Sequence, residues 1–246
     1  MGTLDDLVPV LKKLRLSGVM KTLDLRKRQA LDDDLGIEEF LYRLLQDEVE
    51  RRDSKQTEVR MRRANFEGTK RLEDFEFGFN PKIPKQRIVD LAACHFVDKK
   101  ENVLLIGPTG VGKSHLAQAI GERACRAGNA VLFITAQRLF AQLRGARADQ
   151  SYEKKLLRFT TPDVLVIDDL GLRPLERDEP LDLYEIIRAR YETGSMILTS
   201  NRAIEEWYGL FPDDLMASAA MDRLLHHAEV VVLEGQSYRN PSRKAS

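Results

Sequence analysis

A glycine-rich stretch near the middle of the chain has the residue types and the spacing that hold a phosphate group. Residues 107–114 read Gly-Pro-Thr-Gly-Val-Gly-Lys-Ser and fit the pattern G-x-x-x-x-G-K-[ST]. Glycines let main-chain N–H groups converge on phosphate oxygens, and the helix that follows adds the positive end of its dipole. In this pattern the Lys113 ammonium pairs with the β- and γ-phosphates, and the Ser114 hydroxyl is a ligand of Mg²⁺.

The flanking segments distinguish a nucleotide site from a chance glycine-rich turn. Residues 102–107 are apolar and predict a strand before the stretch, and residues 113–128 predict a helix after it. Because strand, loop and helix occur in the order that the pattern requires, we interpret the stretch as a P-loop. The nucleotide-binding residues expected here are Gly107, Pro108, Thr109, Gly110, Val111, Gly112, Lys113, Ser114 and His115.

Two acids and an amide follow other apolar segments. Asp168 and Asp169 end the segment 163–169, and Asn201 ends the segment 195–201. We expect Asp168 to hold Mg²⁺ with Ser114, and Asp169 to orient the attacking water, although a pair that only caps the next loop has the same pattern. If its strand neighbours the P-loop strand, Asn201 would face the γ-phosphate; the alternative is an asparagine that forms a turn.

The rest of the chain supplies the elements that must position these side chains. Five short apolar strands alternate with helices between residues 102 and 235, which predicts an α/β fold with a five-stranded parallel sheet. Helical periodicity dominates residues 3–65, whereas Gly, Pro and aromatic residues cluster after them. We therefore expect a helical N-terminal domain over 1–66, a linker with a first helix over 67–100, and the nucleotide-binding domain over 101–246.

Composition restricts the class of protein. Lysines plus arginines and aspartates plus glutamates each number 39, so the 246-residue chain has no net charge to attract polyanions as a whole. Its two cysteines are not in a CxxC pair, which favours free thiols and a reducing compartment. No apolar run approaches the roughly 20 residues of a membrane span, and we see no signal peptide. These features predict a soluble, cytoplasmic protein without a membrane partner.

The set of motifs together resembles one family. The stretches "RRANFEGTKRLEDFEF", "LLIGPTGVGKSHLAQAIG", "VLVIDDLGLRPL", "YEIIRARYETGSMILTSN", "MDRLLHHA" and "GQSYR" occur in this order, and they resemble the IstB family of AAA+ ATPases, helpers in bacterial insertion-sequence transposition. The resemblance covers nearly the whole chain. It implies ATP and Mg²⁺ as cofactors, a helical domain before an AAA+ core without a helical lid, and a homo-oligomer on duplex DNA that works with an IstA-type transposase.

The resemblance also suggests roles for residues outside the P-loop. Arg223 matches the arginine that reaches, in trans, the γ-phosphate bound by a neighbouring subunit; the alternative is an intrahelical ion pair or a solvated arginine. Arg188 and Arg190 are rivals for such an interface role, and Arg239 is a candidate sensor arginine in cis. Phe75 and Phe77 match an aromatic box that packs near the adenine or pins the linker.

Two segments are locally basic and are the candidates for DNA contact. Residues 51–71 contain eight basic and three acidic residues, and residues 138–158 contain six basic and two acidic ones. A connection before the strand that ends at Asp168 projects into the central channel in AAA+ assemblies, so its cations would contact phosphates without reading sequence. A solvated helix face has the same composition. The DNA-binding candidates are Arg138, Arg144, Arg147, Lys154, Lys155 and Arg173.

Three other interpretations remain open on the sequence. A DnaC-like helicase loader would bind single-stranded DNA and a replicative helicase, but stacking aromatics are few in the basic segments. A P-loop kinase of a small metabolite would need a substrate pocket and a lid. A scaffold could use ATP only to favour assembly, without hydrolysing it.

Overall fold

The computed structural model describes residues 4–239, and contacts divide the chain into two units, Met1–Val59 and Arg60–Ser246. The helix α3 (Ile37–Ala64) contributes residues to both units. Each unit is described by itself.

The N-terminal unit consists of α1 (Leu4–Lys13), α2 (Ser17–Asp32) and the first part of α3. A buried carboxylate fixes α2 to α3: Glu48 accepts a hydrogen bond from the Gly18 N–H at 2.5 Å and ion-pairs with Arg51 and Arg52 at 2.7 Å each. Position 18 tolerates no side chain, because a Cβ there would lie 2.7 Å from a Glu48 carboxylate oxygen. The helical N-terminal region expected from the sequence is therefore present.

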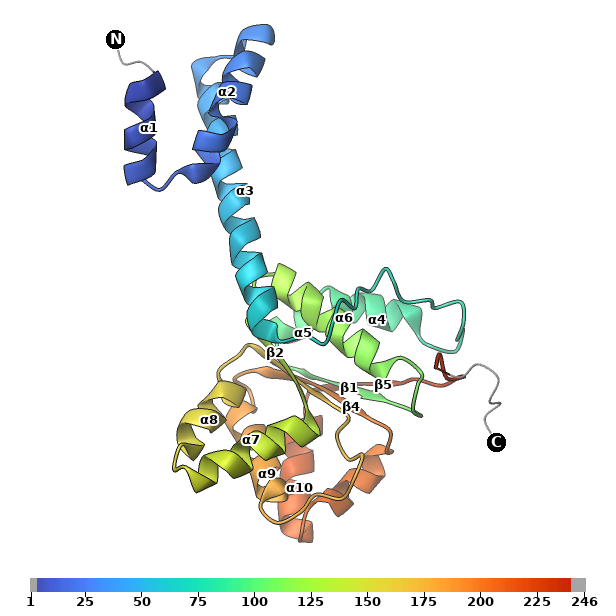
Figure 1. Ribbon diagram of the computed structural model, residues 1–246. Helices are drawn as coiled ribbons and strands as arrows, with labels where there is room; N and C mark the ends of the chain where they lie inside the picture. The colour runs from blue at the N-terminus through green and yellow to red at the C-terminus, as the bar shows by residue number, and fades with distance from the viewer. Residues whose placement is uncertain (1–3, 240–246) are drawn as a thin grey trace. The chain divides into compact units, whose positions relative to one another are not determined.

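The second unit is an α/β layer structure (Figure 1). Its strands are β1 (Asn102–Ile106), β2 (Val131–Thr135), β3 (Val164–Asp168), β4 (Ser195–Ser200) and β5 (Ala228–Val232). Its helices are α4 (Lys85–Ala92), α5 (His95–Asp98), α6 (Lys113–Arg126), α7 (Ala136–Ala148), α8 (Tyr152–Thr160), α9 (Glu179–Arg190), the 3-10 helix η1 (Ile204–Leu210) and α10 (Asp214–Leu225). All strand pairs are parallel, in the order β2-β3-β4-β1-β5, which confirms the predicted five-stranded sheet.

Side chains alternate between two hydrophobic cores, one on each face of the sheet. Along β1, Leu104 and Ile106 join the core with α7, α9 and α10, whereas Val103 and Leu105 join the core with α4 and α6. Because both faces are covered, the strands consist mostly of apolar residues, as expected from the sequence.

The strand order brings the predicted functional segments to one edge. β4 lies between β3 and β1, with Ile106 opposite Ser200, and Thr135 lies opposite Asp168 in the neighbouring pair. The carboxyl ends of β1, β3 and β4 are therefore neighbours, and a ligand site at this edge is the usual arrangement in open parallel sheets.

No helix follows β5 within the described residues, which end at Arg239. Over the same part of the chain, none of the helices combines the length and the apolar character needed to cross a membrane.

Candidate active site

A cavity of about 590 Å³ lies at the carboxyl edge of the sheet, and most of the predicted nucleotide-binding residues line it. The predicted residues that line it are Phe75, Thr109, Gly110, Gly112, Lys113, Ser114, His115, Asp168, Asp169, Asn201 and Arg239. Gly107, Pro108, Val111, Phe77 and Arg223 are outside its lining. Sequence reasoning missed Tyr238, Lys70 and Glu67, which also line the cavity. They lie in stretches that carry the family resemblance, but no individual role at the nucleotide was predicted for these three residues, and the fold brings them in from segments that flank the core.

The P-loop connects β1 to α6. The side chain of Lys113, at its end, folds back onto the first two residues of the loop. The Lys113 ammonium donates to the carbonyl oxygens of Gly107 at 2.7 Å and Pro108 at 2.8 Å. Burial lowers the pKa of Lys113, while the charges of Asp169 and Asp168 oppose that shift. The carboxylates of Asp168 and Asp169 would repel a phosphate. Its attraction to the site therefore comes from Lys113 and the loop N–H groups.

The glycines of the loop are required by close packing. Gly110 has a φ of +87°, and a Cβ there would lie 2.1 Å from the Ser237 hydroxyl oxygen. Gly112 has a φ of +100°, and a Cβ there would lie 2.5 Å from the Phe75 ring. Any larger residue would strain the backbone and displace a neighbour.

The two acids at the end of β3 share one buried hydroxyl group. Thr199 of β4 donates to Asp168 Oδ1 at 2.6 Å and accepts from the Asp169 N–H at 2.9 Å. Burial raises the pKa of Asp168, and the hydroxyls of Thr199 and Ser114 counter the rise. Sequence reasoning missed Thr199. No motif marks it, and the pairing of β3 with β4 gives it these partners.

The donor set at this point fits Mg²⁺. Ser114 supplies a hydroxyl and Asp168 a carboxylate, both hard oxygen ligands. Among the described residues no group of three or more His, Cys, Asp and Glu side chains could hold a metal by itself. Mg²⁺ is commonly bound through few protein ligands together with substrate phosphates and water.

Aromatic rings close one side of the cavity. The Phe75 ring lies 5.3 Å from that of His115 and 5.4 Å from that of Tyr238, measured between centroids. Phe77 packs edge-on against Phe75 at 4.8 Å and lies behind it, outside the cavity lining. Phe75 and His115 are thus the predicted aromatic residues that a nucleotide could contact.

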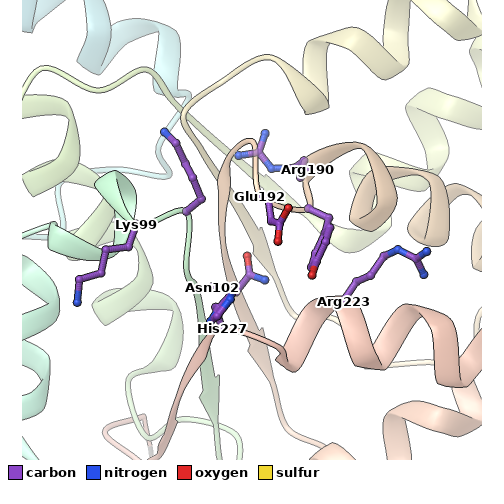
Figure 2. A pocket seen from close by; sticks show the side chains of 8 residues that line it. Lys99, Asn102, Arg190, Glu192, Arg223 and His227 are labelled. Atoms are coloured by element: carbon purple, nitrogen blue, oxygen red, sulfur yellow. The ribbon is translucent and has the colours of Figure 1, made fainter.

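Arg223 lies at the opposite edge of the sheet, where strands begin (Figure 2). It lines a second cavity of about 200 Å³ with Asn102 and His227, which start or precede β1 and β5. Its guanidinium turns away from Asn102, donates to the Ala219 carbonyl at 2.7 Å and lies 5.9 Å from the Tyr184 ring centroid.

The two rival arginines on α9 are differently engaged. Arg190 is 1% exposed and donates four hydrogen bonds of 2.7–3.2 Å to main-chain carbonyls. The acceptors are Phe159, Thr160, Asp163 and Ser195. Arg188 is on the surface and pairs with Glu185 at 2.6 Å. Arg190 therefore joins the chain segments around β3 and β4.

Ion pairs engage four of the six DNA-binding candidates. Arg144 and Arg173 pair with the buried Glu179 at 2.6 and 2.8 Å, and Arg147 pairs with the buried Asp182 at 2.6 Å. Arg138 pairs with Glu67 at 3.0 Å. The remaining two, Lys154 and Lys155, lie on α8 and make no ion pair within the described part of the chain.

Comparisons with known proteins agree with this geometry. A profile of the IstB-like ATP-binding proteins matches residues 9–246. An insertion-sequence ATP-binding protein of Mycobacterium tuberculosis is 44% identical over 230 residues, which cover 93% of this chain and 92% of the relative. The ATP-binding protein of insertion sequence IS21 in Pseudomonas aeruginosa is 37% identical, with 95% and 88% covered.

Solved structures give the fold class. The crystal structure of the DnaC helicase loader superimposes with a TM-score of 0.58 at 20% identity, over 67% of this chain and 97% of that one. The chain therefore belongs to the family of IstB-like ATP-binding proteins, and it is an ATPase.

Proposed function

We propose that this ATPase assembles as a homo-oligomer on duplex DNA, as the helper of an insertion-sequence transposase, and hydrolyses ATP to ADP and phosphate between subunits. The observation that carries the proposal is that the residues proposed for hydrolysis lie at two opposite edges of the sheet. Lys113, Asp168 and Asn201 line the cavity at the carboxyl edge, whereas Arg223 lines the cavity at the amino edge.

Within one subunit the chain can bind and orient the substrate. Lys113 and the loop N–H groups would hold the phosphates, and Ser114 with Asp168 would hold Mg²⁺, which supplies charge neutralisation when bound. Asp169 lines the same cavity and can accept a hydrogen bond from the attacking water. Asn201 is on the neighbouring strand and would orient that water or sense the γ-phosphate.

Lys113 and Arg239 already line this cavity, and hydrolysis would gain from a further arginine at the transferred phosphate. Arg223 is a half-buried cation on α10 that a second copy could receive at its γ-phosphate. Such an arginine can increase hydrolysis by about 10³–10⁵-fold. Supplying it in trans makes hydrolysis depend on assembly.

DNA and transposase are proposed as partners because the relatives are insertion-sequence proteins. Of the six predicted DNA-binding residues, Lys154 and Lys155 of α8 make no ion pair in the described part of the chain, and they are the cations we propose for phosphate contact. Binding through such side chains would be sensitive to salt and largely independent of base sequence.

The test mixes two inactive variants. Arg223→Ala lacks the finger but keeps its P-loop, and Lys113→Ala keeps the finger but cannot bind ATP productively. Each alone should lose ATPase activity on duplex DNA, and a mixture should recover part of it, because some interfaces then pair an intact P-loop with an intact arginine. Sedimentation with ATP and duplex DNA should show a large complex.

The matched control is Arg188→Ala, which removes the same charge from the surface of α9 and should leave hydrolysis unchanged. If mixing restores nothing while Arg188→Ala abolishes activity, the finger assignment is wrong. A complex that forms only on single-stranded DNA would point to a helicase loader, and DNA-independent turnover by a monomer would point to a kinase-like enzyme.

A further inference from the structure

The segment after β5 runs back over the P-loop. We call residues 233–239 the C-terminal strap. It leaves the sheet with the Leu233 N–H donating to the Ile106 carbonyl at 2.7 Å, and it reaches the loop where the Tyr238 N–H donates to the Gly110 carbonyl at 2.9 Å. Between these two bonds the strap lies against the loop glycines: a Cβ on Gly107 would lie 2.1 Å from the Leu233 carbonyl oxygen.

The strap also supplies part of the cavity wall. Tyr238 and Arg239 line the cavity, and the Tyr238 hydroxyl donates to the Glu76 carbonyl at 2.7 Å. Burial lowers the pKa of Lys113, and the nearby charge of Arg239 lowers it further. The position of the strap therefore determines two things: the contacts that support the P-loop glycines, and the placement of Tyr238 and Arg239 in the cavity wall.

One buried side chain outside the cavity holds the strap in place. Asn80 is 3% exposed, and its amide bonds the main chain of Gln236 in both directions. Asn80 Nδ2 donates to the Gln236 carbonyl, and the Gln236 N–H donates to Asn80 Oδ1, each at 2.8 Å. Gly235 lets the amide approach, because a Cβ there, at a φ of +134°, would lie 2.3 Å from Asn80 Oδ1.

We propose that Asn80 is a positioning residue for ATP binding, which acts by clamping the C-terminal strap against the P-loop. The two hydrogen bonds resemble one rung of a β-ladder, made by a side chain and main chain that are 156 residues apart in sequence. Losing the clamp lowers the fraction of molecules in which strap, loop and Arg239 are arranged for the nucleotide. Apparent affinity falls in proportion to that fraction.

A second asparagine provides a matched control. Asn102 is 8% exposed, donates to the Leu224 carbonyl at 3.0 Å and accepts from the Met196 N–H at 3.0 Å, at the opposite edge of the sheet. Asn80→Asp and Asn102→Asp therefore make the same chemical change. In each, the acceptor oxygen remains, the donor is lost, and a carboxylate oxygen faces a main-chain carbonyl.

The experiment measures binding of a fluorescent ATP analogue to the full chain without DNA, at a temperature where circular dichroism shows each variant folded. Asn80→Asp should weaken binding by about tenfold or more, and Asn102→Asp should stay within about twofold of the wild type. Gly235→Ala breaks the same clamp from the strap side and should weaken binding to a similar degree. The double variant Asn80→Asp/Gly235→Ala should bind no more weakly than the weaker of the two single variants, because both changes act through one contact.

Equal affinity of Asn80→Asp and the wild type, or equal losses in Asn80→Asp and Asn102→Asp, would overturn the proposal. If Asn80→Asp does not fold, Gly235→Ala decides by the same criterion. Wild-type binding in the same assay tests the nucleotide site itself, and the assay needs neither DNA nor a neighbouring arginine, so its result is independent of the proposed transposition role.

Discussion

Replacing Thr199 by valine tests whether the acids of the active site are held by the neighbouring strand. Valine keeps the shape of threonine but removes a hydroxyl that donates to Asp168 and accepts from the Asp169 N–H. Thr199 is fully buried, so water cannot replace either hydrogen bond. The change leaves one carboxylate oxygen and one N–H without their partner.

The expected loss follows from these two bonds. A buried donor left unsatisfied costs about 1–3 kcal/mol, and a hydrogen bond to a charged group contributes about 1.5–3 kcal/mol. Since one hydroxyl serves both, the two losses do not add fully, and we expect Thr199→Val to lower the free energy of unfolding by about 2–4 kcal/mol. Thr199→Ser keeps the hydroxyl, loses one methyl group, and should cost about 1 kcal/mol.

Denaturant unfolding can be followed through Trp207, the only tryptophan of the chain, which is buried in the core of the second unit. The valine variant should also hydrolyse ATP about tenfold more slowly or worse, whereas its affinity for ATP should change less, because Lys113 and the loop hold the phosphates. Serine should restore most of the rate. A valine variant as stable as the wild type, or a serine variant as slow as valine, would refute the reasoning.

Three further predictions concern charged side chains. Arg147→Ala should cost about 3 kcal/mol in unfolding because it leaves the buried Asp182 without its bidentate partner, whereas Lys154→Ala should leave stability unchanged and weaken duplex binding with a shallower salt dependence; denaturant titration and DNA titration at several salt concentrations compare them. Arg190→Lys should destabilise the chain strongly, since an ammonium cannot reach four carbonyls, and a normal melting temperature would contradict this. Hydrogen bonds from Arg51 hold the pKa of Glu48 at about 2, so its contribution to stability is complete above pH about 4.5 and lost as pH falls toward 2. Glu48→Gln should remove this part of the acid dependence and leave the part from Asp47, whose pKa the hydrogen bond from Arg26 also lowers to about 2. Helix content measured between pH 2 and 7 should therefore fall less in the variant than in the wild type, and an equal loss would contradict this.

Sequence alone was sufficient for the parts that depend on local pattern. The P-loop could be predicted because its glycines, Lys113 and Ser114 are contiguous, and because strand and helix signals flank them. The five strands could be predicted because burial on both faces requires continuous apolar runs. Asp168 and Asn201 were found because polar residues directly after such runs lie at the ends of strands.

Tertiary structure decided which distant side chains meet. Several arginines of the basic segment 138–158 have the composition of a DNA-binding surface, yet the fold pairs Arg147 with Asp182, which lies 35 residues away in sequence. Thr199 and Asn80 looked like ordinary polar residues until the sheet order and the return of the strap gave them partners. Ion pairs and buried amide contacts depend on distances of a few ångströms between segments far apart in the chain, and no local pattern encodes those distances.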